Sequence, residues 1–147
     1  MKLFKALFVV LSILLISCSK TTNTPLPITT KSEKALENYK RGYYEWGNHD
    51  GLKRWQYMNE ALILDPDFIL ANLYINEPDP KKRKTYRDNA VNNKNNGTEA
   101  ERIRVDIFLA NREGNTNESI RLAQELVSKY PTSSEAYVDL GNAYNNI

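Results

Sequence analysis

Cys18 is the only thiol in the 147-residue chain, and its position indicates the chemistry it can do. A thiolate is the best nucleophile that a protein offers for taking a diacylglyceryl group as a thioether. Twelve uncharged residues, 6–17, precede Cys18, and the basic residues Lys2 and Lys5 precede those. This order is typical of a secretory signal, because twelve residues are too few to cross a bilayer, which needs about 20 apolar residues.

The segment LISC, which ends at Cys18, resembles the bacterial lipobox, in which a small residue precedes a lipidated cysteine. The resemblance implies that residues 1–17 are a lipoprotein signal peptide and that Cys18 becomes the lipidated N-terminus. Each buried methylene adds roughly 0.8 kcal/mol of membrane affinity, so two or three acyl chains anchor a protein firmly. We therefore expect a lipid anchor in the bacterial cell envelope, in the outer membrane and facing the periplasm or the surface. The alternatives are a cleaved signal of a soluble secreted protein and a cysteine buried in the core.

Other residues that could do chemistry are sparse. His49 is the only histidine, so neither a histidine-based triad nor a histidine-rich metal site is expected. The acidic segments DPD (65–67) and DP (79–80) flank expected helix ends, where aspartate caps the next helix. The glycines do not form a phosphate-binding loop. We therefore expect no enzyme activity, no catalytic residue, no metal and no cofactor.

The charge balance argues against nucleic-acid binding. The chain has 20 Lys and Arg and 18 Asp and Glu, and two of the lysines lie before Cys18. The expected mature chain therefore carries 18 basic and 18 acidic residues, a net charge of zero. Nucleic-acid binding needs a basic face, so we expect no nucleic-acid partner.

Composition divides the rest of the chain into two parts. Residues 19–32 are rich in Thr, Ser and Pro and predict a flexible tether, which together with the lipidated Cys18 makes up the segment 18–32. From residue 33 apolar residues recur at helical spacing, as in Leu36, Tyr39, Tyr43 and Trp46. Further helices are expected over about 52–64, 67–76, 81–94, 100–110 and 120–127, and over 133–147. A second stripe, Leu52, Trp55, Met58 and Leu62, predicts the buried face of the helix that ends before Asp65.

The spacing of these helices resembles the tetratricopeptide repeat. Candidate capping boxes begin at Thr30, Thr98 and Thr132, at separations of 68 and 34 residues. The segments EAYVDLGNAY (135–144) and MNEALILDP (58–66) match conserved stretches of that family. The resemblance implies an all-α fold, an α-solenoid of antiparallel helix pairs with about three and a half repeats over 33–147. Ala61 and Gly141 would then let neighbouring helices approach closely.

In that family the first helix of each repeat lines a concave surface that binds peptides, so the resemblance implies a partner of this kind. Register with the family marks a candidate peptide groove of Arg41, Tyr44, Arg104, Phe108, Asn111, Arg112, Asn142 and Asn145. Guanidinium groups and amides could grip an extended peptide and its carboxylates. Arg104 and Arg112 could instead be surface charges paired with Glu101 and Glu113.

The last expected repeat has a first helix only, so Ala143 and Ile147 should face absent neighbours. We expect a chain truncated at its C-terminus, or self-association through the open end. The leading hypothesis is a membrane-anchored scaffold that binds a protein or peptide. The alternatives are the interaction arm of a longer enzyme or sensor, and a lipoprotein of glycan uptake whose aromatic residues at 39–57 stack on sugars; for these aromatics we favour a core role.

Overall fold

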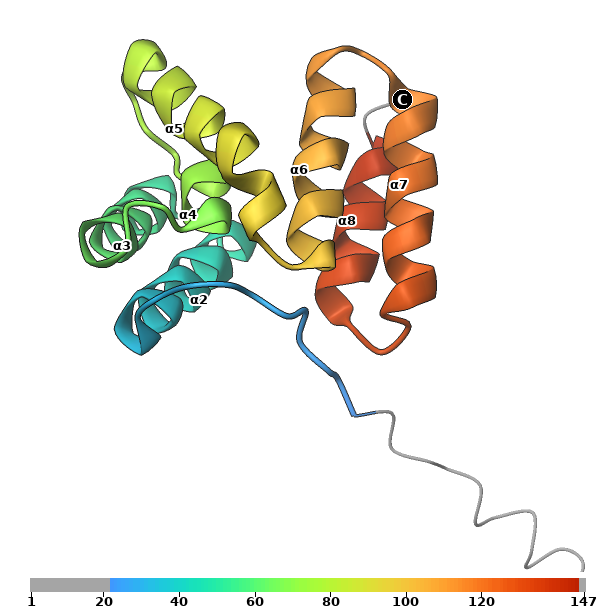
Figure 1. The fold of residues 1–147 in the computed structure, drawn as a ribbon, viewed down its shortest axis with the longest axis horizontal. Coiled ribbons are helices and arrows are strands. Elements are labelled where there is room, and N and C mark those ends of the chain that lie inside the picture. The colour runs from blue at the N-terminus through green and yellow to red at the C-terminus, as the bar shows by residue number, and fades with distance from the viewer. Residues whose placement is uncertain (1–21, 146–147) are drawn as a thin grey trace, which may run out of the picture.

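The computed structural model describes residues 22–145, which form seven α-helices and one short 3₁₀ helix (Figure 1). This part of the chain contains no β-strand, which confirms the all-α class. It also contains no helix with the length and apolar character needed to cross a membrane. The helices are α2 (Glu33–Gly47), α3 (Gly51–Leu64), α4 (Ile69–Tyr74), α5 (Pro80–Asn93), η1 (Lys94–Asn96), α6 (Glu99–Arg112), α7 (Thr116–Lys129) and α8 (Ser134–Asn145).

Side-chain caps fix where most helices begin. The Thr98 side chain accepts a hydrogen bond from the backbone N–H of Glu101, whose carboxylate accepts one from the backbone N–H of Thr98, so this predicted capping box is confirmed. Asp79 caps α5, with Pro80 at the first helical position, as expected for a helix start. The two other predicted boxes are wrong. Ser32 rather than Thr30 caps α2, and the Ser133 hydroxyl rather than Thr132 accepts the hydrogen bond from the N–H of Ala136 at the start of α8.

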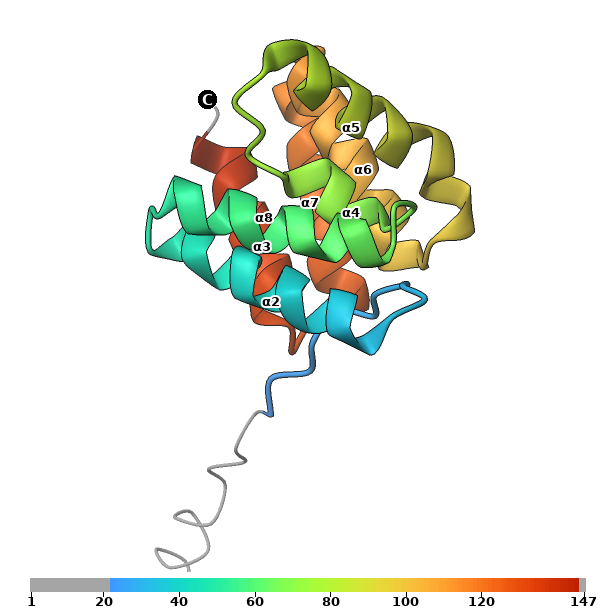
Figure 2. The same ribbon diagram turned by 90° about the vertical axis from the view of Figure 1, so that its left-hand side faces the viewer.

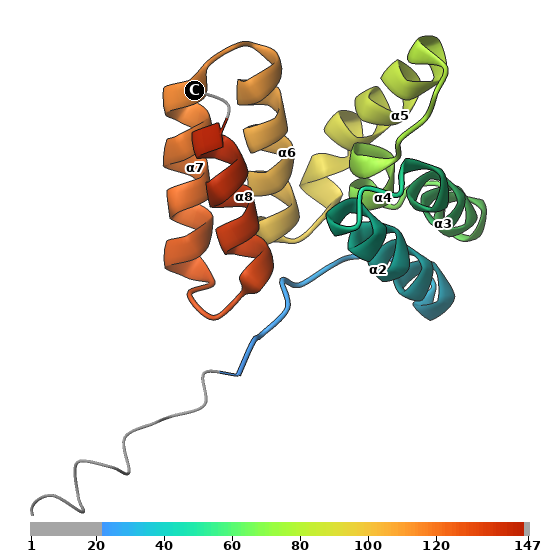
Figure 3. The same ribbon diagram turned by 180° about the vertical axis from the view of Figure 1, so that it is seen from behind.

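The helices pack as sequential neighbours in two groups. One group contains α2–α5, and the other contains α6–α8 (Figures 1 and 3). Within the groups α2 packs on α3, α4 on α5, α6 on α7, and α7 on α8. In addition, α2 contacts α4, α4 contacts α6, and α6 contacts α8, so the first helices of successive pairs form a continuous row. Figure 2 shows α2 and α3 crossing in front of the second group.

Each helix group has its own apolar core. The larger core buries residues of α2–α5 around Met58, Phe68 and Leu70. The smaller one buries residues of α6–α8 around Ala123 and Leu126. Helix α6 joins them, because its Val105 is buried in the larger core while Ile103 and Ile107 belong to the smaller one.

Residues 23–31, which we call the strap, run in extended conformation along both helix groups (Figure 1). Leu26 is buried in the smaller core and Ile28 packs against the larger one. The strap is also held by hydrogen bonds between the following pairs: Ser134 N–H to Asn23 Oδ1, Thr24 N–H to Thr132 O, Thr98 Oγ1 to Pro27 O, Thr29 N–H to Glu101 Oε1, and Thr30 Oγ1 to Asp65 Oδ2. The flexible tether predicted for residues 18–32 is therefore wrong over 23–31, because two apolar side chains and these polar contacts fix a segment whose composition is that of a linker.

The close helix approach that we predicted at Gly141 occurs at Gly42 instead. A Cβ on Gly42 would lie 3.1 Å from Met58 Cε and 3.3 Å from Tyr57 Cβ, so α2 and α3 nearly touch there. Gly141 is exposed and a Cβ on it would have no neighbour within 4 Å. The expected role of Ala61 is confirmed, because it is fully buried between helices.

Two further predictions about buried faces are wrong. Leu52 is 67% exposed, because it lies in the first turn of α3 and the buried face of this helix begins beyond it, at Met58, Ala61 and Leu62. Ala143, expected to face an absent neighbour, is fully buried in the smaller core, whereas Tyr137 and Tyr144 are about half exposed. Helix α8 is thus rotated relative to the expected register and turns its small residues inward. Ile147 lies outside the described residues.

Candidate peptide-binding groove

Two cavities lie along the inner side of α2 and α8, and Arg104 of α6 lines both of them. The inner cavity has a volume of about 310 Å³ and lies between the two helix groups. Its lining residues are Trp46, Tyr74, Arg104, Ile107, Phe108, Asn111, Asp139, Asn142 and Asn145. The strap cavity, of about 440 Å³, is lined by Pro25, Leu26 and Ile28 of the strap and by Leu36, Tyr39, Lys40, Tyr43, Tyr44, Arg104, Ser134 and Glu135. We call the two cavities together the groove.

The structure brings together most of the predicted groove residues. Five of the eight line the inner cavity, namely Arg104, Phe108, Asn111, Asn142 and Asn145. Tyr44 lines the strap cavity instead, and it also lines a shallow neighbouring depression, where Arg41 pairs with Glu37. Arg112 is exposed at the end of α6, with its guanidinium carbon 5.9 Å from the centre of the Phe108 ring. Cys18, the predicted lipidation site, lies outside the described residues.

Arg104 is a buried residue, not the surface charge paired with Glu101 that we considered. Its Nε lies 2.8 Å from Asp139 Oδ2, and only 1% and 7% of the two side chains are exposed. Its other nitrogens donate hydrogen bonds to the hydroxyl groups of Tyr39 and Tyr43, and its guanidinium carbon lies 4.9 Å from the centre of the Tyr74 ring. Arg104 therefore joins α6 to α2, α4 and α8. Glu101 caps α6 and accepts from the strap at Thr29 instead.

This buried network has unusual electrostatics. Burial raises the pKa of the Asp139 carboxyl, although the nearby charge of Arg104 acts in the opposite direction. Burial alone would lower the pKa of Arg104, but Tyr74 and Asp139 outweigh it, so that the guanidinium stays charged. Burial also raises the pKa of Tyr39 and Tyr74, which keeps both hydroxyl groups protonated at neutral pH. The centre of the groove thus holds one cation and one anion, paired with each other.

Aromatic rings form the wall of the groove on the side of α2 and α4. Tyr43 meets the edge of Trp46 with ring centres 5.5 Å apart, and Trp46 lies at the same distance from Tyr74. Tyr39 packs between Tyr43 and Phe68. These rings cover one another, which is consistent with the core role that we favoured over a platform for sugars.

Sequence reasoning missed four lining residues of the inner cavity: Trp46, Tyr74, Ile107 and Asp139. Trp46 was assigned to the core because it continues an apolar stripe. Asp139 had a detectable signal, because it is an acidic residue three positions after Ala136 and four before Ala143, on the face of α8 that these small residues bury. A charged residue on a buried helix face needs a partner of opposite charge.

The groove offers binding groups rather than a reactive set. Asn111, Asn142 and Asn145 provide amide donors and acceptors around the apolar surface of Phe108 and Ile107. His49 lies in the exposed turn after α2 with a φ of 58° and does not line either cavity of the groove. Within residues 22–145 no three His, Cys, Asp or Glu side chains gather in a way that could hold a metal ion. An extended peptide, whose backbone pairs with amides, suits this lining.

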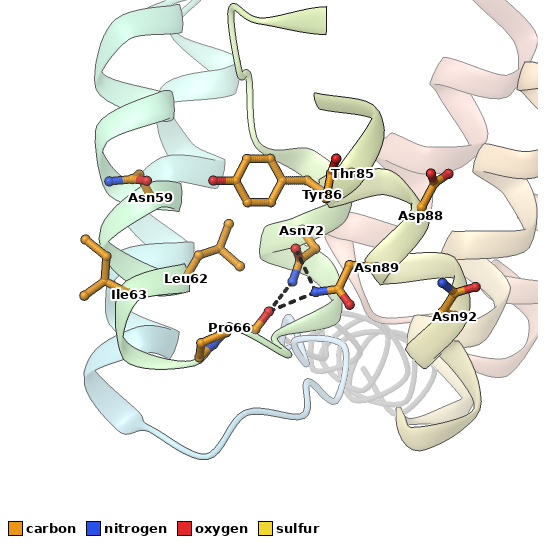
Figure 4. Close-up of a pocket in the computed structure, with 10 residues that line it drawn as sticks. All are labelled: Asn59, Leu62, Ile63, Pro66, Asn72, Thr85, Tyr86, Asp88, Asn89 and Asn92. Atoms are coloured by element: carbon orange, nitrogen blue, oxygen red, sulfur yellow. Dashed lines mark hydrogen bonds between the residues drawn. The ribbon is translucent and has the colours of Figure 1, made fainter. Parts of the chain in front are cut away.

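A separate cavity of about 460 Å³ lies between α3, α4 and α5, and Figure 4 shows its asparagine-rich lining. The amide nitrogens of Asn72 and Asn89 both donate to the backbone oxygen of Pro66, and that of Asn89 also reaches Asn72 Oδ1. These amides are therefore used to hold the turn before α4 against α5. We assign this cavity a structural role.

Comparisons of the chain with protein-family models, with curated proteins and with solved structures found no match.

Proposed function

We propose that this chain is a tetratricopeptide-like scaffold, anchored in the bacterial cell envelope by a lipid on Cys18, that binds an extended peptide segment of a protein partner in the groove. The observation that carries the proposal is the inner cavity. It gathers amides and an aromatic side chain from α6 and α8 opposite the rings of α2 and α4. Nothing in this set points to bond-making chemistry, and its donors and acceptors match a peptide backbone.

The packing supports an α-solenoid as the basis for this groove. The pairs α2–α3, α4–α5 and α6–α7 follow the expected division of the chain, and α8 adds a single helix. The first helices α2, α4, α6 and α8 contact one another in sequence, which is the arrangement that places first helices along one concave side. Helix α4 has only six residues, so its pair with α5 is shorter than a full repeat.

Binding can be tested with a peptide array that is probed with the full chain. The matched variants are the double substitution Asn111→Ala with Asn142→Ala, and Asn117→Ala on the exposed side of α7. Two lost hydrogen bonds to a ligand should weaken the affinity for captured peptides about tenfold. The proposal is rejected if the double variant binds the captured peptides as tightly as Asn117→Ala does, or if the wild-type chain captures no peptide.

The anchor part of the proposal rests on the LISC segment and has its own test. Labelled palmitate should be incorporated into the wild-type protein and not into Cys18→Ser. The strap adds a geometric consequence. Only residues 19–22 separate Cys18 from Asn23, so a lipid on Cys18 holds the start of the strap within about 18 Å of the bilayer. A flexible tether that ran to residue 32 would allow a larger distance between the helices and the bilayer. We propose that the α7–α8 turn, to which Asn23 is bonded, faces the membrane.

A further inference from the structure

Three arginine side chains lie against aromatic rings of the inner cavity, and the described lining of this cavity has no free carboxylate to neutralise their charge. Arg54 of α3 stacks on Trp46, with its guanidinium carbon 4.7 Å from the ring centre. Arg87 of α5 and Arg112 of α6 approach Phe108 at 5.3 and 5.9 Å. Both rings line the inner cavity, whose one carboxylate, Asp139, already pairs with Arg104. We call Arg54, Arg87 and Arg112 the cationic rim.

The rim arginines have no carboxylate of their own among the described residues. The ion pairs in residues 22–145 involve none of the three. Arg54 donates to the backbone oxygen of Tyr74, which leaves part of its fork of donors unused. Arg87 is half-buried and, within the described part of the chain, contacts the ring of Phe108 without an acceptor for its N–H groups.

The surroundings of Arg87 disfavour its charged form. Burial and the neighbouring charges of Arg54 and Arg83 lower the pKa of Arg87 to about 10. The nearby Nε of Arg83 is also buried without an acceptor. A half-buried cation whose donors have no protein acceptor is stabilised by an anion that accepts from it, and guanidinium groups pair best with the two oxygens of a carboxylate.

We propose that the cationic rim binds a carboxylate of the peptide in the groove, so that the ligand is an acidic segment or a peptide end with a free carboxyl group. This inference rests on the proposed peptide groove and defines its ligand. The carboxylate contacts Arg54 and Arg87 while the adjacent backbone lies over Phe108 and the asparagines of α6 and α8. Arg54 and Arg87 lie on α3 and α5, the second helices of their pairs, and were not predicted from family register, whereas Arg112 of α6 was.

Citrate is the first probe, because it presents carboxylates without a peptide. It is titrated into the full chain at constant ionic strength, and the Nε–Hε resonances of isotope-labelled arginine are followed. Citrate should shift the resonances of Arg87 and Arg54. The resonance of Arg121, which is paired with Glu118 on α7, should stay unchanged. Arg87→Gln should weaken citrate binding about tenfold, and the charge-matched control Arg121→Gln should leave it unchanged.

The stability of Arg87→Gln separates lost binding from lost folding. Because Arg87 is half-buried and lacks an anion, its replacement should leave the unfolding midpoint unchanged or raise it. Unshifted Arg87 and Arg54 resonances, or equal losses in both variants, overturn the proposal.

Captured peptides are then compared in two forms, one with an amidated end and one with each Glu and Asp replaced by Gln and Asn. The form that loses affinity identifies the source of the carboxylate. If both neutral forms bind as tightly as the original peptide, and bind the wild type and Arg87→Gln with equal affinity, the carboxylate site at the cationic rim is rejected while the proposed peptide groove is not. Citrate binding to the rim without any peptide capture instead rejects the proposed function and supports the rim as an anion site.

Discussion

Arg104 Nε and Asp139 Oδ2 lie 2.8 Å apart at the centre of the groove, and both side chains are almost completely buried. Another guanidinium nitrogen of Arg104 donates a hydrogen bond to Asp139 Oδ1 at 3.5 Å, so the pair is held by charge and by hydrogen bonding. The pair connects α6 with α8, and the two tyrosine hydroxyl groups that Arg104 reaches connect it with α2. One buried cation thereby sets the spacing of three helices that line the groove.

Removing one member of this pair should be strongly destabilising. Asp139→Ala leaves Arg104 buried without its anion, which should lower the free energy of unfolding by about 3–5 kcal/mol. The double variant Arg104→Leu with Asp139→Leu should lose less than Asp139→Ala alone, because no uncompensated charge remains. Urea unfolding measures both.

The control for this pair is Glu118→Ala, which breaks the exposed pair with Arg121 and should cost less than about 1 kcal/mol. If Asp139→Ala were as mild as that control, Asp139 would not act as the anion that Arg104 requires.

Two helix glycines, one at a helix contact and one exposed, should change stability in opposite directions when each is replaced by alanine. Gly42→Ala adds a Cβ at 3.1 Å from Met58 and should destabilise by about 1–3 kcal/mol, because α2 must move away from α3. Gly141→Ala adds a Cβ where no atom lies within 4 Å, so it should stabilise by about 0.5–1 kcal/mol through helix propensity. Thermal unfolding of the two variants checks the signs. A stabilised Gly42→Ala would show that the two helices are not in contact there.

The strap should contribute to the stability of the helical body. Leu26 is 3% exposed in the smaller core, so Leu26→Ala should cost about 2–4 kcal/mol. Leu64→Ala on α3 is the matched control, since Leu64 is 46% exposed, and it should cost less than about 1 kcal/mol. Equal midpoints in urea for the two variants would mean that the strap is not packed against the helices in solution.

Strap attachment should also depend on pH through Asp65. Burial alone would raise the pKa of Asp65, but the hydrogen bonds from Thr30 and Lys31 outweigh it and lower the pKa below 3.8. A carboxylate whose pKa is lowered by folding stabilises the folded state above its unfolded pKa, and this stabilisation is lost as the pH falls through the folded value. Asp65→Asn should therefore be about 1–3 kcal/mol less stable than the wild type at pH 7.

The difference in the free energy of unfolding between wild type and Asp65→Asn should begin to shrink below about pH 4, where the unfolded carboxyl group takes up a proton, and should be lost as the pH falls through the lower pKa of the folded state. Urea unfolding at several pH values measures it. A difference that stays constant from pH 7 down to about pH 3 would show that the charge of Asp65 does not hold the strap.

The sequence predicted the helices well because their signals are local. Apolar spacing and the caps at Asp79 and Thr98 depend on residues within one or two turns. Family register placed Phe108, Asn111 and Asn142 on one surface for the same reason. The strap was missed because its composition is that of a linker, and only the packing of Leu26 and Ile28 against distant helices fixes it. The pairing of Arg104 with Asp139 and the cationic rim likewise depend on how helices far apart in sequence come together.

Site-specific photocrosslinking in living cells tests the central claim, that the groove receives a protein segment, most directly. A photoreactive phenylalanine derivative is placed at Asn145, in the inner cavity, and separately at Asn117, on the exposed face of α7. We expect a discrete crosslinked partner from position 145 that is absent from position 117 and lost with Asn111→Ala and Asn142→Ala. Crosslinks from position 117 alone, or crosslinks from position 145 that persist in the double variant, would contradict the claim.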